Sequence, residues 1–220
     1  MQKIKAVVFD MDGTIFDSEP VYMKVLQDAA AKLGGQISDE LYLSTVGTTM
    51  AESYDILAAG LNKDFPMDEF RVLWPKMWEE YTLENGVVLK DGLLDLFRHL
   101  NENGIIKALA TSSFQQEANM CLSISGLRKE FDSVVTGDLV RNGKPNPEIY
   151  LKAANNIGVE PEFCLAIEDS NAGARAAISA GMQTVIIPDL IPANPDIKAD
   201  VIAELESLSE VIPLLKKLNT

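Results

Sequence analysis

The sequence is poor in the residues on which many enzymes depend. Its 220 residues include a single histidine and only two cysteines. A zinc site of the usual ligand types needs several of these residues, and a Ser-His-Asp triad needs a positioned histidine. We interpret Cys121 and Cys164 as buried free thiols, which suit a reducing compartment. Chemistry in this chain is therefore expected to rest on carboxylates, lysine and hydroxyl groups.

Basic residues are also scarce, with 19 Lys and Arg against 33 Asp and Glu, for a formal net charge of −14. This balance argues against nucleic acid or an anionic membrane as a partner. No apolar run approaches the ~18 residues of a membrane span. The strand-like pattern that begins at Ile4 leaves no room for a signal peptide. We expect a cytoplasmic protein that is a monomer or a weak homo-oligomer, and that must build a local positive site to bind any anion.

Short apolar runs alternate with helical patterns through most of the chain. The runs are residues 4–9, 105–110, 132–137, 163–168 and 182–187. Near-continuous apolar strands are typical of parallel sheets that are covered on both faces. The alternation predicts an α/β fold with a doubly wound parallel sheet.

One region interrupts this alternation directly after the first strand. It contains only helical patterns, at residues 19–34, 39–45, 50–60 and 67–83. An insertion of this kind is better explained as a separate cap than as part of the sheet. We therefore predict a catalytic core of residues 1–15 and 87–220, and an α-helical cap domain of residues 16–86.

Polar residues follow four of the predicted strands, at the sheet edge where doubly wound folds bind ligands. The residues are Asp10, Asp12, Gly13 and Thr14 after the first strand, Thr111, Ser112 and Ser113 after the second, Lys144 beyond the third, and Glu168, Asp169 and Ser170 after the fourth. Four carboxylates need a cation, because like charges at close range raise one another's pKa. An all-oxygen site suits Mg²⁺. With a lysine and hydroxyl groups to grip a phosphate, this set predicts a phosphoryl-transfer site.

The closely spaced pair Asp10 and Asp12 then has two complementary roles. Asp10, nearest the end of the strand, is the candidate nucleophile that would become an aspartyl phosphate. Asp12 is the candidate acid/base, which protonates the leaving oxygen and later deprotonates water. Gly13 permits a sharp turn with positive φ. Thr111, Ser112 and Lys144 are the candidate phosphate-binding residues.

Four motifs resemble those of the haloacid dehalogenase superfamily of aspartate-nucleophile phosphohydrolases. They are DMDGT, ATSS, GKPNPEIY and IEDSNAG, in the family's order along the chain. The resemblance lies with the helical-cap branch that contains β-phosphoglucomutases and phosphoglycolate phosphatases. It implies that Mg²⁺ is organised by Asp10, the backbone carbonyl of Asp12, Glu168 and Asp169, and that the cap closes over the site. Asp12 argues against dehalogenation, because dehalogenases of this superfamily lack the second aspartate.

The cap sequence bears on the choice between a phosphatase and a mutase. A β-phosphoglucomutase-like enzyme must grip a second phosphate of its substrate, typically with an arginine in the cap loop that aligns with VGTTMAES. Here Met50 falls near that position, and Tyr22 stands where the mutases carry a histidine. An apolar loop holds a dianion poorly, so the phosphatase is favoured. Candidate substrate contacts in the cap are Tyr22, Gly47, Thr48, Thr49, Met50 and Lys76.

The sequence thus predicts a magnesium-dependent phosphatase for a small phosphorylated metabolite, such as a sugar phosphate. A sugar phosphomutase is the first alternative. A phosphorylatable receiver-like signalling module is an alternative of another class, because such modules also combine an acceptor aspartate, a hydroxyl and a lysine on a doubly wound sheet. A receiver has no counterpart to the helical cap, and it would not release phosphate over many turnovers.

Overall fold

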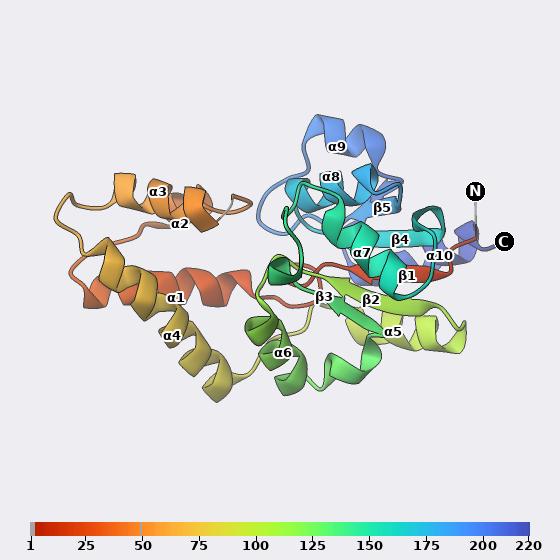
Figure 1. The fold of residues 1–220 in the computed structure, drawn as a ribbon, viewed down its shortest axis with the longest axis horizontal. Helices are drawn as coiled ribbons and strands as arrows, with labels where there is room; N and C mark the ends of the chain where they lie inside the picture. The colour runs from red at the N-terminus through yellow and green to blue at the C-terminus, as the bar shows by residue number, and fades with distance from the viewer. Residues whose placement is uncertain (1–2, 49) are drawn as a thin grey trace. The chain divides into compact units, whose positions relative to one another are not determined.

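The computed structural model describes residues 3–48 and 50–220, which form two compact units (Figure 1). The first unit, called the core unit below, contains Val88–Thr220 together with the chain up to Asp17. The second, called the cap unit, is Ser18–Val87.

The core unit is built on a six-stranded parallel sheet with the order β3-β2-β1-β4-β5-β6. Its strands are β1 Ala6–Phe9, β2 Ile106–Ala110, β3 Ser133–Val135, β4 Cys164–Glu168, β5 Gln183–Ile186 and β6 Ala203–Glu204. The predicted α/β class with a doubly wound parallel sheet is confirmed. The first five strands fall inside the apolar runs identified from the sequence, whereas the two-residue β6 was not predicted.

Helices cover both faces of this sheet (Figure 1). The core helices are α5 Leu93–Glu102, α6 Gln115–Ile124, α7 Glu148–Asn156, α8 Asn171–Ser179, α9 Pro195–Asp200 and α10 Val211–Leu218. α7 packs on β1, β2 and β3, α8 packs on β4 and β5, and α5 packs on β2 and also contacts α10. This layering explains why the strands carry almost no exposed residues.

Small side chains pack the face of the sheet that α7 and α8 cover. On one face, β1 and β4 present Ala6, Val8 and Ala166 to alanines of α7 and α8, such as Ala153 and Ala176. Small side chains on both sides let these helices lie close to the strands. This close approach brings α7 and α8 near the end of β4, where polar residues follow.

Aromatic side chains pack against β1 as well. The Phe9 ring meets Phe97 of α5 edge-on at a centroid distance of 5.4 Å, and Phe131 at 6.1 Å. Phe9 itself is fully buried. Edge-to-face aromatic pairs add to the stabilisation from burial alone, so the strand that precedes Asp10 is firmly held.

The described residues of the cap unit contain four helices, α1 Glu19–Lys32, α2 Asp39–Leu43, α3 Met50–Gly60 and α4 Met67–Asn85. Helices α1 and α4 pack against each other. Their interface includes Tyr22, whose ring is stacked on Trp78 at 5.4 Å and meets Trp74 edge-on at 6.4 Å. The unit therefore has an aromatic core of its own.

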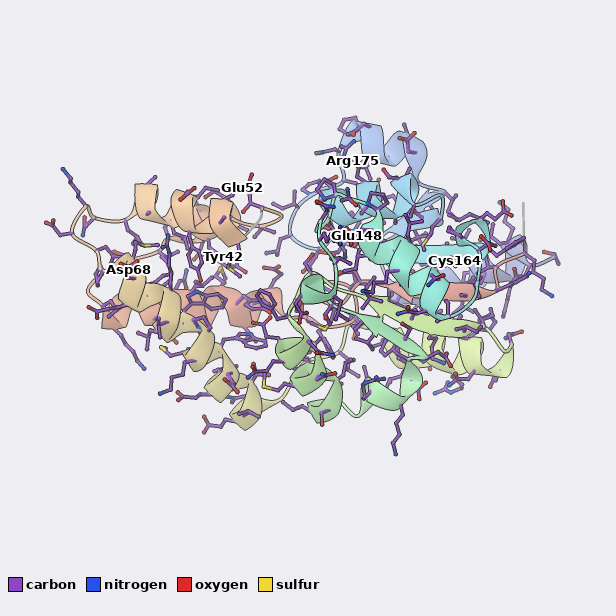
Figure 2. All side chains as sticks on the ribbon, viewed as in Figure 1. Tyr42, Glu52, Asp68, Glu148, Cys164 and Arg175 are labelled. Atoms are coloured by element: carbon purple, nitrogen blue, oxygen red, sulfur yellow. The ribbon has the colours of Figure 1, made fainter. Side chains whose placement is uncertain are left out.

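The described part of the chain contains no helix that is both long and apolar enough to span a membrane. Cys121 and Cys164 are both buried and unpaired, as predicted; Cys164, labelled in Figure 2, lies at the start of β4.

Candidate functional site

Asp10 follows β1 at the point where the strand order of the sheet reverses. β1 pairs with β2 on one side and β4 on the other, and Phe9 lies opposite Ile167. The Asp10 N–H donates to the Ile167 carbonyl at 3.0 Å. This register places Asp10 beside Glu168. Crevices at such switch points are where open α/β sheets bind their ligands.

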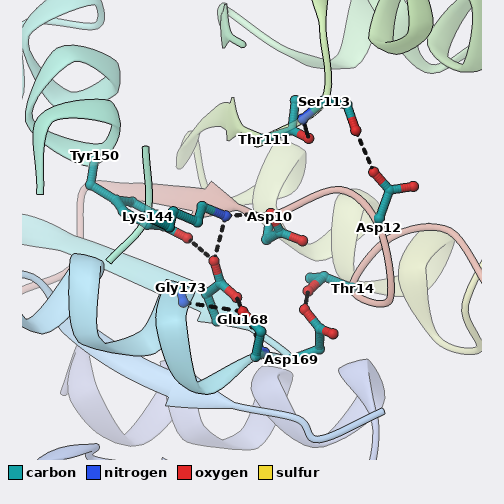
Figure 3. A network of polar contacts seen from close by, with 11 residues as sticks. Asp10, Asp12, Thr14, Thr111, Ser113, Lys144, Tyr150, Glu168, Asp169 and Gly173 are labelled. Carbon is teal, nitrogen blue, oxygen red and sulfur yellow. Dashed lines mark hydrogen bonds and ion pairs between the residues drawn. The ribbon is translucent and has the colours of Figure 1, made fainter. Parts of the chain in front are cut away.

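The turn after β1 requires glycine at position 13. Gly13 has a φ of +78°, and its N–H donates to the Phe16 carbonyl at 2.9 Å. A Cβ at this position would overlap the carboxylate of Asp169. The next residue, Thr14, donates from its Oγ1 to Asp169 Oδ1 at 3.3 Å (Figure 3). The loops that leave β1 and β4 are thus in direct contact through Asp169.

Lys144 supplies the positive charge that this acidic chain needs. Its Nζ pairs with Asp10 Oδ1 and with Glu168 Oε1, the latter at 2.6 Å (Figure 3). The side chain is only 7% exposed, so the ion pairs are shielded from solvent. Burial alone would lower the pKa of Lys144, but Asp10 and Glu168 outweigh it and raise that pKa, so the ammonium stays charged.

The loop that carries Lys144 is fixed by Glu148, the first residue of α7 and labelled in Figure 2. Its carboxylate accepts hydrogen bonds from the N–H groups of Arg141 and Asn142, at 2.9 and 3.1 Å. Hydrogen bonds to the carboxylate hold the pKa of Glu148 below its usual value. Glu148 thereby ties the loop to the helix that follows it.

The hydroxyl residues after β2 differ in burial and in hydrogen-bond partners. Thr111 is 1% exposed, and its Oγ1 accepts a hydrogen bond from the Ser113 N–H at 3.0 Å. Ser113 Oγ lies 2.7 Å from Asp12 Oδ2, and Figure 3 shows the Asp12 carboxylate directed toward this serine. Ser112 is exposed. Thr111 and Ser113 therefore both have defined partners in the cluster.

Three carboxylates of the core unit are close enough to hold one cation. Asp10, Glu168 and Asp169 each offer an oxygen, and these oxygens all lie within 4.8 Å of one another. Carboxylate oxygens are the ligands that hard divalent ions prefer. The donor set therefore fits a metal ion of this class.

The ionisation of the cluster also reflects this crowding. Burial, and to a lesser extent the charge of Glu168, raise the pKa of Asp10 from 3.8 to about 7, although Lys144 acts in the opposite direction. Burial, together with Asp10 and Glu168, raises the pKa of Asp169 well above its usual range. Without a cation, the folded protein thus holds protons at this edge of the sheet near neutral pH.

We expect the metal-free protein to lose stability as the pH rises from 5 to 7.5. Asp10 and Asp169 bind protons more tightly in the folded state, so folding is favoured while they are protonated and weakened as they ionise. The expected loss in unfolding free energy is on the order of 2 kcal/mol. Urea denaturation with chelator present at both pH values measures it. In Asp10→Asn, the unfolding free energy is expected to depend less on pH. A wild-type unfolding free energy that rises between pH 5 and 7.5 would contradict the assignment.

The predicted substrate contacts of the cap all belong to the cap unit. Tyr22 is stacked on Trp78, Thr48 Oγ1 donates to the Thr45 carbonyl at 2.7 Å, and Lys76 lies 3.9 Å from Glu80. Met50 is exposed and begins α3, and Gly47 has a φ of +78°. Thr49 lies outside the described residues. Tyr22, Thr48 and Lys76 thus each have a partner within the cap unit.

Sequence reasoning assigned no individual role to several residues that the structure brings into the cluster. They are Ser170 and four residues that Figure 3 labels, Thr14, Ser113, Tyr150 and Gly173. Thr14, Ser113 and Ser170 stand directly beside predicted site residues, which is a usable signal. Tyr150 is the third residue of α7, where only the helix register could indicate that it points to the sheet edge.

The chain matches known proteins along nearly its whole length. A model of the haloacid dehalogenase-like hydrolases matches residues 4–181. The phosphorylated carbohydrates phosphatase of Thermotoga maritima is 33% identical over 218 residues, covering 97% of this chain and 99% of that protein. Hexitol phosphatase B of Escherichia coli is 30% identical, covering 96% and 95% of the two chains.

Solved structures agree with these matches. The crystal structure of CbbY from Rhodobacter sphaeroides in complex with phosphate has a TM-score of 0.80 and 27% identity, and the match covers 94% of this chain and 96% of that one. On the strength of the sheet topology, the carboxylate and lysine cluster and these similarities, the chain belongs to the haloacid dehalogenase-like hydrolase family.

Proposed function

We propose that this protein is a magnesium-dependent phosphatase that hydrolyses a small phosphorylated carbohydrate through an aspartyl phosphate on Asp10. The observation that carries the proposal is the buried Asp10–Lys144–Glu168 cluster, with Asp169 beside it, at the switch point of the sheet. A buried carboxylate held against an ammonium is positioned to attack and to tolerate the charge of a phosphate ester. The names of the two phosphatase relatives point to the same substrate class.

The first half-reaction transfers the phosphoryl group to the protein. A carboxylate oxygen of Asp10 forms a bond to phosphorus as the bond between phosphorus and the substrate oxygen breaks. Asp12 donates a proton to that leaving oxygen, which departs as an alcohol. Lys144 and Thr111 are the groups that would hold the phosphoryl oxygens. Lys144 is buried beside Asp10, and Thr111 is buried at the end of β2, the strand next to β1.

The second half-reaction releases phosphate. Asp12, now ionised, removes a proton from a water molecule, whose oxygen bonds to phosphorus while the bond from Asp10 to phosphorus breaks. Inorganic phosphate leaves and Asp10 is restored as a carboxylate. Asp12 serves both steps, and its contact with the Ser113 hydroxyl, at 2.7 Å, is one that the side chain can exchange for a substrate oxygen.

Asp10, Asp169 and the backbone carbonyl of Asp12 are the groups that would hold Mg²⁺, with Glu168 close by. The ion supplies charge neutralisation between the nucleophile and the anionic ester. Asp169 is oriented for this by Thr14, and a side chain at Gly13 would displace it. Thr14 thus orients Asp169, which forms no ion pair with the residues that the structure describes.

We expect Asp169→Asn to raise the magnesium concentration for half-maximal activity by about tenfold or more, because a ligand charge is lost. Phosphate release measured across a magnesium titration provides the test. Asp196→Asn is the matched control, because Asp196 is exposed and its carboxylate pairs with Arg175 at the protein surface. Chelator is expected to stop the wild-type reaction. A magnesium dependence that Asp169→Asn leaves unchanged would contradict the metal assignment.

The cap loop supports hydrolysis over phosphoryl transfer between two positions of a sugar. The segment from Thr45 to Ser53 contains no lysine or arginine. On the last cap helix, Arg71 lies 3.6 Å from Asp68, with its guanidinium over the Tyr54 ring at 4.9 Å. A mutase must hold a second phosphate dianion, and a loop without a cation is poorly equipped for this.

A panel of phosphate esters tests the proposal. Phosphate release is measured with hexose, pentose and hexitol phosphates, and with phosphoglycolate and nucleoside monophosphates for comparison. Asp10→Asn protein purified in the same way reports any contaminating phosphatase. We expect sustained turnover on carbohydrate esters. Conversion of β-glucose 1-phosphate, with its bisphosphate activator, to the 6-phosphate without phosphate release would identify a mutase instead. Release that stops after one turnover would identify a receiver-like module.

The proposal extends to location and assembly. Two buried unpaired thiols suit the reducing cytoplasm. We place the reaction there, in a protein that acts as a monomer or a weak homo-oligomer and needs no nucleic acid or membrane partner.

A further inference from the structure

Tyr150 is a buried phenol whose hydroxyl points into the catalytic cluster. It lies on α7 and is 0% exposed. Its hydroxyl donates a hydrogen bond of 2.5 Å to Glu168 Oε1, and its ring centroid lies 5.2 Å from Lys144 Nζ (Figure 3). Buried tyrosines usually satisfy their hydroxyl with some partner. Here that partner is the carboxylate that also binds the catalytic lysine.

Glu168 is saturated by donors from the protein. Its Oε1 accepts from Lys144 Nζ at 2.6 Å and from Tyr150, and its Oε2 accepts from the N–H and Oγ of Ser170 at 3.3 and 3.0 Å. An ionised carboxylate offers about four lone-pair sites, so these four contacts fill them. On the side of α8, the carboxylate lies directly against Gly173, in the space that a Cβ at this position would fill. Glu168 is therefore built as a rigid acceptor.

Lys144 is shared between this rigid acceptor and Asp10. The position of a shared ammonium depends on how strongly each carboxylate attracts it. The Tyr150 hydroxyl satisfies part of the Glu168 charge, and the tyrosine ring offers its face to the ammonium. Without the hydroxyl, Glu168 Oε1 would keep an unpaired lone pair in a dry site, and it would draw Lys144 away from Asp10.

We propose that Tyr150 is a positioning residue of the phosphoryl-transfer site: its hydroxyl fixes Glu168, so that Lys144 stays directed at Asp10 and at the phosphoryl group. This inference rests on the proposed function and deepens it. It assigns Glu168 chiefly to the placement of Lys144, which leaves Asp10 and Asp169 as the carboxylates that face a cation.

Tyr150→Phe removes one oxygen and keeps the ring, so it tests the hydroxyl alone. We expect binding of inorganic phosphate, measured by isothermal titration calorimetry with magnesium chloride present, to weaken about tenfold, because one hydrogen bond to a charged group is lost. We expect kcat on the best ester of the panel to fall by a similar factor. The magnesium concentration for half-maximal activity should stay within about twofold of wild type, since Asp169 is untouched.

Tyr42→Phe is the matched control. It deletes a buried hydroxyl that also donates to a glutamate, Glu19, but in the cap unit. Phosphate binding by the core is expected to be unchanged in this variant. A role of Tyr150 in stability alone would lower the unfolding midpoint of Tyr150→Phe and leave its phosphate affinity at the wild-type value, which would overturn the inference.

A double-mutant cycle with Glu168→Gln tests whether Tyr150 acts through Glu168. If it does, adding Tyr150→Phe to Glu168→Gln should cost little further phosphate affinity. Losses that multiply would overturn the inference. The binding readout also separates it from the proposed function. A wild-type protein that hydrolyses esters, with a Tyr150→Phe variant that binds phosphate equally well, refutes the role of Tyr150 alone. A wild-type protein that binds phosphate but hydrolyses no ester refutes the phosphatase, while the two binding curves still decide the role of Tyr150.

Discussion

Asp10→Asn is expected to lower kcat by more than about 10⁴-fold on every ester that the wild-type protein hydrolyses. An amide has almost no nucleophilicity toward phosphorus, so the covalent step is lost while the shape of the side chain is kept. The structure makes this test specific, because Asp10 is buried at the end of β1 and is the carboxylate that Lys144 holds beside Glu168. Phosphate release under saturating magnesium measures the effect.

The same substitution should leave the fold intact or make it more stable. A buried carboxylate whose pKa is raised to about 7 is a destabilising charge in the metal-free protein at pH 8, and the amide removes it. Circular dichroism and urea denaturation establish this. Asp95→Asn, at an exposed position on α5, controls for a general effect of removing an aspartate. Normal activity in folded Asp10→Asn protein would refute the proposed mechanism.

Asp12→Ala is expected to lower kcat on carbohydrate esters by about 10²- to 10⁴-fold, because both half-reactions lose their proton carrier. The leaving group separates the two steps. A sugar alkoxide cannot leave without a proton, so phosphorylation of Asp10 should become slow. p-Nitrophenolate leaves without one, so with p-nitrophenyl phosphate only the hydrolysis of the aspartyl phosphate should be slow.

Rapid mixing of Asp12→Ala protein with p-nitrophenyl phosphate should therefore show a burst of about one nitrophenol per active site, followed by slow turnover. No comparable burst of product is expected with a sugar phosphate. Asp95→Ala serves as the control. If Asp12→Ala slowed both substrates to the same extent, with no burst on p-nitrophenyl phosphate, Asp12 would not be the acid and base of the reaction.

Much of the core could be predicted, because short, near-continuous apolar runs predict the strands and the strand order determines where their ends meet. Five of the six strands coincide with such runs. β6 was missed because Ala203–Glu204 is only two residues long and carries no apolar run.

The sequence allowed us to predict which residues of the candidate site meet, but not how their side chains are oriented. Asp10, Lys144, Glu168 and Asp169 come together as parallel strand ends require. Glu168 accepts hydrogen bonds from Lys144, Tyr150 and Ser170. These contacts depend on how α7 and α8 are rotated about their axes, which a sequence pattern specifies only coarsely. The cap contacts depend on loop conformations, which lack a periodic signal altogether.

Gly13 and Asp169 occupy neighbouring space so tightly that the two positions must be treated as a single unit in protein engineering. A larger acid in place of Asp169, introduced to alter the preferred ion, would be pushed against the backbone at Gly13, and no residue with a side chain could accompany it there. Attempts to retune the ion preference are therefore better directed at Thr14, whose hydroxyl orients Asp169 and can be varied without filling that gap.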